Sequence, residues 1–266
     1  MLKSNNLYLG DCLDLLAKIE DQTIDLVFLD PPYNLQLNKV LTRPNHSIVN
    51  GVNQDWDKFD SYSSYDDFTF SYLTECKRVL KPDGGLWIIG SYHNIFRIGK
   101  ILQDLNFWIL NDVIWAKSNP LPNFRATRLT NAHETLIWCS KKPKSKYQFN
   151  YHTLKVANED RQERSIWNFP ICSGKERLKN NKNQTAHPTQ KPLALMKKII
   201  IQSSIQGDLV LEPFAGTASF CAEAKYLGRN YIGFEKDDGY FNLAIKRLKK
   251  IKSLKNDLLE INEKDK

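Results

Sequence analysis

The sequence Ile24-Asp25-Leu26-Val27-Phe28-Leu29-Asp30-Pro31-Pro32-Tyr33 joins an apolar run to a carboxylate, two prolines and an aromatic ring. The run is typical of a buried strand because it is short and almost continuously apolar. Two consecutive prolines remove two N–H donors, so the carbonyl oxygens of Asp30 and Pro31 remain free to accept hydrogen bonds. Acceptors beside the ring of Tyr33 suit an amino group on a flat heterocycle, such as a nucleobase turned out of its helix. The alternative is a turn in which the prolines only end the strand.

Further apolar runs alternate with helical patterns along the chain. We expect strands at residues 24–29, 85–89, 108–114, 135–139, 209–211 and 231–234. We expect helices at residues 65–80, 94–104, 192–203 and 220–227, and a turn at residues 81–85. This alternation predicts a mostly parallel, doubly wound α/β sheet with both faces covered. At 266 residues and 41% hydrophobic content, residues 1–266 can form one such domain with insertions.

Two polar stretches interrupt the alternation. Residues 36–61 are rich in Asn and directly follow Tyr33, which is typical of a binding loop. Residues 141–183 carry Lys and Arg residues among the aromatic residues Tyr147, Phe149, Tyr151, Trp167 and Phe169. This mixture suits contact with phosphates and bases. The alternative is a solvated insertion whose rings pack on the main core.

The overall composition narrows the class of protein. A net charge of +8 favours a polyanionic partner such as nucleic acid, although a lysine-rich compositional bias would also raise it. No apolar stretch approaches the ~20 residues that span a bilayer, and residues 1–6 lack a signal-peptide core, so we expect a cytoplasmic protein. The five cysteines are scattered without Cys-x-x-Cys spacing, so we expect no disulfide framework and no metal site.

A second candidate site lies near the C-terminal end. The strand at residues 209–211 leads into Phe214-Ala215-Gly216-Thr217-Ala218-Ser219 and a helix, and small residues there let a ligand approach the backbone. The next strand ends in Glu235, at the distance where a carboxylate accepts from ribose hydroxyls. With one glycine in the loop, the pyrophosphate fingerprint of a nicotinamide enzyme is not met. A tight turn without a ligand is the alternative.

Before that strand lies a polar loop, Ala186-His187-Pro188-Thr189-Gln190-Lys191-Pro192. Thr189, Gln190 and Lys191 offer donors and a positive charge that suit the carboxylate of a small ligand. We expect His187 to be a structural hydrogen-bonding residue rather than a general base, because no carboxylate or nucleophile lies beside it in the sequence.

The order of these motifs resembles that of the β-group of DNA amino-methyltransferases, in which the catalytic half precedes the cofactor half. The likeness is closest to the cell-cycle-regulated adenine methyltransferases and their restriction-modification relatives that act on GANTC. It rests also on residues 30–37, 89–97, 108–112 and 131–136, and it spans nearly the whole chain. The resemblance implies a Rossmann-like, S-adenosylmethionine-dependent fold with permuted motif order, a DNA-facing loop at residues 36–61 and a target-recognition insertion at residues 141–183.

The resemblance also implies a reaction. A methyl group would pass from S-adenosylmethionine to N6 of a flipped adenine in double-stranded DNA, with GANTC as the implied recognition sequence. Asp30 and the Pro31 carbonyl would accept both amino hydrogens, Pro32 would complete the motif, and Tyr33 would stack on the base. The residues implied around the cofactor are Asp11, Cys12, Asp30, Thr189, Gln190, Lys191, Phe214, Ala215, Gly216, Thr217, Ala218, Glu235 and Lys236.

The segment before residue 134 carries candidate contacts to DNA. Their basic, amide and imidazole groups suit phosphates or base edges, and they are Lys117, Asn119, Asn123, Arg125, Arg128, Asn131 and His133. Two features depart from the family pattern. Ala218 replaces a glycine, and in place of the family's C-terminal DNA-binding domain we expect one basic helix at about residues 240–259 and a charged tail.

Several alternatives remain open from the sequence. Cytosine N4 methylation would use the same amine geometry, although relatives that act on cytosine more often carry Ser in place of Asp30. An RNA amine methyltransferase and a DNA-binding remnant without cofactor affinity are the others. A homodimer and a cognate restriction endonuclease are partners on which the sequence does not decide.

Overall fold

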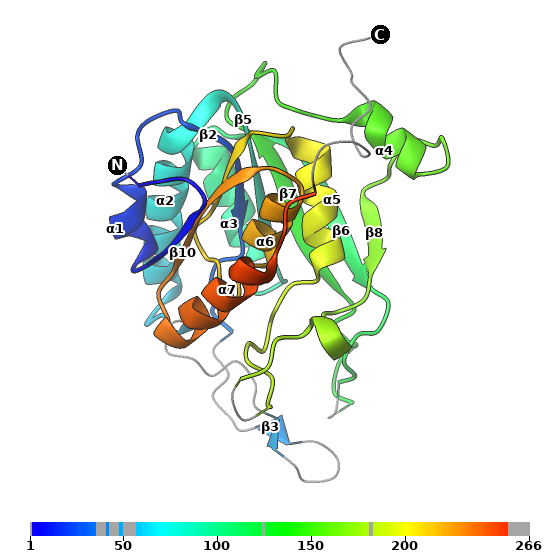
Figure 1. The fold of residues 1–266 in the computed structure, drawn as a ribbon. Coiled ribbons are helices and arrows are strands. Elements are labelled where there is room, and N and C mark those ends of the chain that lie inside the picture. Colours follow the sequence, from blue (N-terminus) through cyan, green and yellow to red (C-terminus); the bar gives the residue numbers. More distant parts are fainter. Residues whose placement is uncertain are drawn as a thin grey trace.

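The computed structural model describes residues 2–35, 41–42, 48–49, 57–123, 126–180 and 183–254. Its described strands form an eight-stranded sheet in the order β1-β10-β9-β2-β5-β7-β6-β8, with helices on both sides (Figure 1). These strands are β1 (Asn6–Leu9), β2 (Ile24–Leu29), β5 (Leu80–Gly90), β6 (Trp108–Lys117), β7 (His133–Ser140), β8 (Ile166–Phe169), β9 (Leu209–Glu212) and β10 (Asn230–Glu235). A separate antiparallel pair consists of β3 (Leu41–Thr42) and β4 (Ile48–Val49).

The sheet is mostly parallel, as predicted. Strands β1, β10, β9, β2 and β5 run parallel to one another, and β8 runs parallel to β6. Only β7 among these strands is antiparallel to both of its neighbours, β5 and β6. The helices are α1 (Cys12–Leu16), α2 (Tyr62–Val79), α3 (Ile95–Asp104), α4 (Tyr151–Ala157), α5 (Leu193–Ser203), α6 (Ser219–Tyr226) and α7 (Asp238–Lys250), with a 3₁₀ turn at Gly174–Glu176.

The apolar run of β2 is buried on both faces of the sheet, which confirms the prediction for it. Leu26 and Phe28 belong to a core shared with α5, α6 and α7. Val27 and Leu29 belong to a second core shared with α1, α2 and α3. Successive side chains of a strand point to opposite faces, so a strand covered on both sides is apolar at nearly every position.

Three local predictions are corrected. The predicted turn at residues 81–85 is part of β5: Leu80 pairs with Ile24 and Gly85 with Leu26, so the intervening residues bulge out without ending the strand. Helix α2 begins at residue 62 because Ser61 and Ser64 form a capping box. Helix α7 ends at residue 250, where Ile251 takes an extended conformation, and the last part of the predicted helix lies outside the described residues.

The rings of residues 141–183 pack on the core, as in the alternative interpretation of this stretch. Trp138 contacts the rings of Tyr147 and Phe149 at centroid distances of 5.3 and 5.4 Å, and Trp167 lies 5.5 Å from Trp87. These three rings therefore contribute to the core. A role of this stretch in target recognition stays a prediction, as does a DNA-facing role of residues 36–61, most of which lie outside the described part.

The described part of the chain contains no helix with the length and apolar composition that a bilayer crossing requires. Within the same residues, no three His, Cys, Asp or Glu side chains gather as a metal site would need.

Candidate active site

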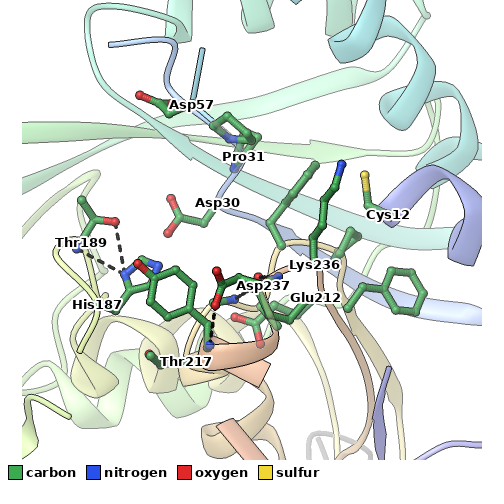
Figure 2. Close-up of a pocket in the computed structure, with 18 of the residues that line it drawn as sticks. Cys12, Asp30, Pro31, Asp57, His187, Thr189, Glu212, Thr217, Lys236 and Asp237 are labelled. Atoms are coloured by element: carbon green, nitrogen blue, oxygen red, sulfur yellow. Dashed lines mark hydrogen bonds between the residues drawn. The ribbon is translucent and has the colours of Figure 1, made fainter. Parts of the chain in front are cut away.

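A cavity of about 670 Å³ lies at the carboxyl ends of the central parallel strands, where open α/β sheets bind their ligands. Its size is typical of a small-molecule site. Figure 2 shows Asp30 and Pro31, which follow β2, facing Glu212 of β9 and Lys236, which follows β10, across it. The two sequence motifs therefore meet in one site.

The cavity brings together nearly all the residues that the sequence predicted for catalysis and cofactor binding. It is lined by all four residues of the Asp-Pro-Pro-Tyr motif. The predicted cofactor residues that line it are Asp11, Cys12, Asp30, Thr189, Gln190, Lys191, Phe214, Ala215, Gly216, Thr217, Glu235 and Lys236. Their binding roles stay predictions, but their shared location follows from the sheet order, which places β1, β10, β9 and β2 side by side.

The loop that carries Tyr33 is held by a buried carboxylate. Asp57 Oδ1 accepts hydrogen bonds from the backbone N–H groups of Tyr33 (2.6 Å) and Asn34 (2.8 Å), and Oδ2 accepts from that of Leu35 (3.0 Å). Asn34 takes a left-handed conformation with φ of 54°, which turns the chain at this point. Asp57 was not predicted as a site residue because no local pattern marks it within the polar stretch.

The carbonyl groups of the motif divide into occupied and available acceptors. The Pro32 oxygen accepts from the Tyr65 hydroxyl at 2.9 Å and from the Asn94 amide at 3.5 Å. Among the described residues, no hydrogen bond reaches the Pro31 oxygen. Pro31 lines the cavity, and its carbonyl therefore keeps its capacity to accept a hydrogen bond there.

Four charged side chains meet beside Tyr33. Lys191 Nζ lies 2.8 Å from Asp30 Oδ2 and 3.8 Å from Glu134 Oε2, and Lys117 Nζ lies 2.8 Å from Glu134 Oε1. The Tyr33 hydroxyl donates to Glu134 Oε2 at 2.9 Å. Glu134 was not predicted as a site residue, although a carboxylate near the start of an apolar strand was a signal for it.

Burial and neighbouring charges act against each other in this group. Burial raises the pKa of Asp30, and Lys191 only partly offsets the rise. Burial also raises the pKa of Glu134, but the charges of Lys191 and Lys117 outweigh it and leave that pKa below its ordinary value. Burial lowers the pKa of Lys191, but Asp30 and Glu134 raise it above its ordinary value. Lys191 and Glu134 are therefore charged at neutral pH.

The loop after β9 meets the end of β10 through Glu235. Its Oε2 accepts from the Gly216 N–H at 2.6 Å and its Oε1 from that of Asp237 at 2.7 Å. Burial raises the pKa of Glu235 to about 7. Gly216 has φ of +53°, and a Cβ there would lie 3.2 Å from His187 Nε2, so glycine is required at this position.

A second buried carboxylate forms the floor of this end of the cavity. Glu212 accepts from the backbone N–H groups of Phe220 (3.3 Å) and Cys221 (2.9 Å) in the first turn of α6. Burial raises its pKa to about 7, and these hydrogen bonds oppose the rise. Glu212 therefore caps the helix terminus that the sequence marked as a ligand site.

One wall of the cavity is aromatic. Phe59 and Phe68 line it with Phe214, and Phe68 and Tyr72 contact the Phe214 ring at centroid distances of 6.2 and 5.1 Å. These rings come from α2 and the segment before it, which no motif marked. They provide a flat apolar surface of the kind on which a purine ring packs.

Ala218 differs from the expectation. Ala218 is fully buried in the core shared with α5, α6 and α7, and it does not line the cavity. It takes a left-handed conformation with φ of 54°. Replacing glycine by Ala therefore affects backbone strain rather than the space available to a ligand.

The loop before α5 also differs in part. The Gln190 side chain accepts from Leu178 N–H and donates to the Glu176 carbonyl, both at 3.0 Å, so it also fastens the chain beside the cavity. Lys191 is paired with Asp30 rather than free for a ligand carboxylate. Burial lowers the pKa of His187 to about 4, and its Nδ1 lies 3.3 Å from the Thr189 backbone nitrogen, as expected of a structural residue.

Five of the seven predicted DNA contacts form two groups. Lys117 is buried against Glu134, and Asn119 Oδ1 accepts from the Ile171 N–H, so these two side chains serve the fold. Arg128, Asn131 and His133 are exposed at the edge that carries the cavity, where β7 begins beside the end of β5.

The remaining two predicted DNA contacts, Asn123 and Arg125, belong to neither group. The Asn123 amide donates to the Arg128 carbonyl at 3.0 Å, and Arg125 lies outside the described residues.

Comparison with known proteins agrees with this geometry. The N6_N4_Mtase family model, described as DNA methylase, matches residues 24–246. Type II methyltransferase M.HinfI from Haemophilus influenzae is 51% identical over 254 residues, which cover 96% of this chain and 71% of that protein. Type II methyltransferase M2.MboI from Moraxella bovis is 40% identical over 250 residues, covering 94% and 89%.

A solved structure shows the same architecture. The crystal structure of the M1.HpyAVI–SAM complex superposes with a TM-score of 0.65 at 28% identity, covering 91% of this chain and 98% of that one. The order of motifs, the position of the cavity and these similarities agree. The chain belongs to the N6/N4 family of DNA methylases, which transfer a methyl group from S-adenosylmethionine to DNA.

Proposed function

We propose that this methyltransferase acts on N6 of an adenine flipped out of duplex DNA, with GANTC as its recognition sequence. The observation that carries the proposal is the placement of Asp30, the Pro31 carbonyl and Tyr33 together on the cavity wall. The sequence resemblance to adenine methyltransferases acting on GANTC supports the target, and so does the 51% identity to a type II methyltransferase.

The chain supplies acceptors for a weak nucleophile. The lone pair of an exocyclic amine is delocalised into its ring, and two acceptors on the amino hydrogens favour a pyramidal nitrogen. Asp30 and the Pro31 carbonyl are these acceptors, and Tyr33 stacks on the extruded base. Bound S-adenosylmethionine supplies an electrophilic methyl group. As an acceptor of one amino hydrogen, Asp30 would also take the proton that the amine loses.

The opposite side of the cavity fits a nucleoside joined to an amino acid. Each Glu235 oxygen accepts one backbone hydrogen bond and keeps a further lone pair for a ribose hydroxyl. Residues 214–217 would hold the methionine part, Asp11 and Cys12 the adenosine, and Thr189 the amino-acid end. Gln190 and Lys191 act through the protein residues that they contact.

Duplex DNA approaches the edge of the sheet at which β7 begins. Arg128 Nη1 donates to the Tyr92 hydroxyl at 2.7 Å, and both side chains are exposed there. An arginine held against an aromatic ring suits a phosphate or a base. The type II names of both relatives support a cognate restriction endonuclease and a cytoplasmic location. A homodimer stays a prediction.

Long-read sequencing of DNA from cells that express the chain tests the target. We expect N6-methyladenine at GANTC, and no such mark in cells that express the Asp30→Ala variant. Modification of cytosine, or of adenine in another motif, would contradict the proposed target while leaving methyl transfer itself intact. Absence of any mark would contradict the function.

Cofactor affinity is expected to depend on pH through Glu235. Its carboxylate accepts ribose hydroxyls when ionised, so affinity is full above its pKa of about 7 and declines as the pH falls through that value. We expect the dissociation constant to rise about tenfold from pH 8 to pH 6. Equilibrium binding of labelled cofactor measures it. Glu235→Gln should bind more weakly and show a flat profile, whereas an unchanged profile would assign the titration to Glu212 instead.

Replacing Ala218 by Gly is expected to change little. Relief of left-handed strain is about 1–2 kcal/mol, and it is offset by a lost buried methyl, about 0.8 kcal/mol, and by a freer unfolded chain, about 0.4–1 kcal/mol. Denaturant unfolding should therefore shift by less than about 1 kcal/mol. The cofactor dissociation constant should stay within about twofold, because the methyl group faces the core. Tenfold tighter binding would mean that the methyl group obstructs the cavity.

A further inference from the structure

Four charges of alternating sign form a row at the active site that is largely shielded from solvent. Lys117 from β6, Glu134 from β7, Lys191 from the loop before α5 and Asp30 after β2 follow one another at 2.8, 3.8 and 2.8 Å. Their side chains are between 6% and 19% exposed, so water screens them little. The row ends at the carboxylate that faces the substrate.

Such a row is not explained by stability alone. Taking charges out of water costs several kcal/mol per ion, and apolar side chains of similar volume often stabilise a core as well or better (about 1–4 kcal/mol). Charged groups with perturbed titration, gathered in a cleft, are typical of functional sites. In this protein the row lies on the wall of the cavity and two of its members, Asp30 and Lys191, line it.

Lys191 determines how Asp30 meets a ligand. Its ammonium group holds Oδ2 at 2.8 Å, and the Tyr33 hydroxyl also interacts with this carboxylate. These contacts fix the plane of the carboxylate, whose remaining lone pairs can accept an amino hydrogen. Lys191 Nζ also lies 5.2 Å from the centre of the Tyr33 ring and 3.5 Å from the Thr189 carbonyl oxygen. One ammonium group thus touches both parts of the base site.

Glu134 holds the other side of this arrangement. Its Oε2 accepts from the Tyr33 hydroxyl at 2.9 Å and faces Lys191, while Lys117 neutralises its Oε1 at 2.8 Å. Tyr33 is therefore anchored at its hydroxyl while its ring lies on the cavity wall. Removal of Glu134 would release the ring and one side of the ammonium group together.

We propose that Lys191 and Glu134 are positioning residues for methyl transfer, Lys191 by orienting Asp30 towards the target amine and Glu134 by holding Lys191 and Tyr33. This deepens the proposed function and rests on it. Neither residue needs to contact the cofactor for this role, and the geometry assigns Lys191 to the base half of the site.

The first test is Lys191→Met in the full chain, assayed by single-turnover methyl transfer to duplex DNA. We expect the rate to fall about 100-fold, as for a misplaced reacting group, while KM for DNA changes less than about threefold. We also expect the acid limb of the pH–rate profile to move to higher pH. Asp30 must be ionised to accept a hydrogen bond from the amine. Without the neighbouring ammonium group the pKa of Asp30 rises, so the side chain becomes protonated at a higher pH.

The Glu134→Gln variant should move the acid limb of the pH–rate profile to lower pH. The groups that face Asp30 are Lys191, Glu134, Tyr33 and, from β9, Glu212. Replacing Glu134 by its neutral isostere removes a negative neighbour, so Asp30 is ionised down to lower pH. We expect a rate loss of about tenfold, because Tyr33 keeps a hydrogen-bond partner in the amide oxygen.

Two comparisons separate positioning from a merely structural role. Lys81→Met removes the ammonium group that lies 2.6 Å from Asp25, at the opposite end of β2, and should keep the wild-type rate and profile. The double variant Glu134→Gln/Lys191→Met should lose less than the product of the single losses, because the two residues act as a unit. Circular dichroism verifies folding, and the isosteric Glu134→Gln carries the test if Lys191→Met does not fold.

A wild-type rate in Lys191→Met or Glu134→Gln would overturn the proposal. The proposal would also be overturned if the acid limb of the pH–rate profile did not move, or if it moved in the same direction in both variants. These failures differ from failure of the proposed function, in which the wild-type chain itself would transfer no methyl group to DNA.

Discussion

Replacement of Asp30 by Ala is expected to lower the rate of methyl transfer at least about 1000-fold, the effect of removing a preorganised group that acts on the transition state. The carboxylate is one of the two acceptors that the proposed mechanism uses for the amino hydrogens, the other being the Pro31 carbonyl. Cofactor binding should remain measurable, because Glu235 at the end of β10 and residues 214–217 after β9 line the cavity from other strands than the one that Asp30 follows.

Single-turnover kinetics and equilibrium binding of labelled cofactor measure the two effects separately. Asp30→Asn is the matched variant, since its amide keeps the size of the side chain and one acceptor oxygen, and its rate should lie between those of Asp30→Ala and the wild type. Full turnover by Asp30→Ala would contradict the role of the motif.

The second large effect is expected at Asp57. Asp57→Ala leaves three backbone N–H groups of the Tyr33 loop without their acceptor, and at about 1 kcal/mol for each hydrogen bond the free energy of unfolding should fall by about 3 kcal/mol. Because Tyr33 then loses its fixed position, the rate of transfer should also fall, by about 100-fold. Denaturant unfolding and single-turnover kinetics measure these two quantities.

Asp60→Ala is the control for this prediction. Asp60 is an exposed carboxylate three residues away in the same segment, and its replacement should change both quantities little. An Asp57→Ala variant with wild-type stability would show that the loop does not depend on the buried carboxylate.

The strands of the sheet were predictable from local pattern. The run from Ile24 to Leu29 is apolar at nearly every position because both faces of β2 are buried, and the structure has these bounds. The bulge in β5 was not predictable from Pro82 and the following glycines, because those residues suit a turn equally well. Whether such residues end a strand or bulge from it depends on pairing with β2.

The residues of the site also divide into those that local sequence predicts and those that depend on distant contacts. The acceptors around Pro31 and the loop at Gly216 were predictable because prolines and small residues constrain the backbone locally. Asp57 and Glu134 were not, since each matters through a contact with a residue distant in sequence: Asp57 with the loop at Tyr33, and Glu134 with Lys191. The same reason explains Lys117, whose charge suggested DNA but which pairs inside the protein.

Analysis of the methylated nucleoside tests the central claim most directly. Purified protein is incubated with duplex DNA and S-adenosylmethionine that carries an isotopically labelled methyl group, and the DNA is then digested to nucleosides for mass spectrometry. The amine site at Asp30 and Pro31, together with the similarity to adenine methyltransferases, predicts labelled N6-methyladenine. Labelled N4-methylcytosine as the product would contradict the adenine assignment, and a product without label would contradict methyl transfer from the cofactor cavity.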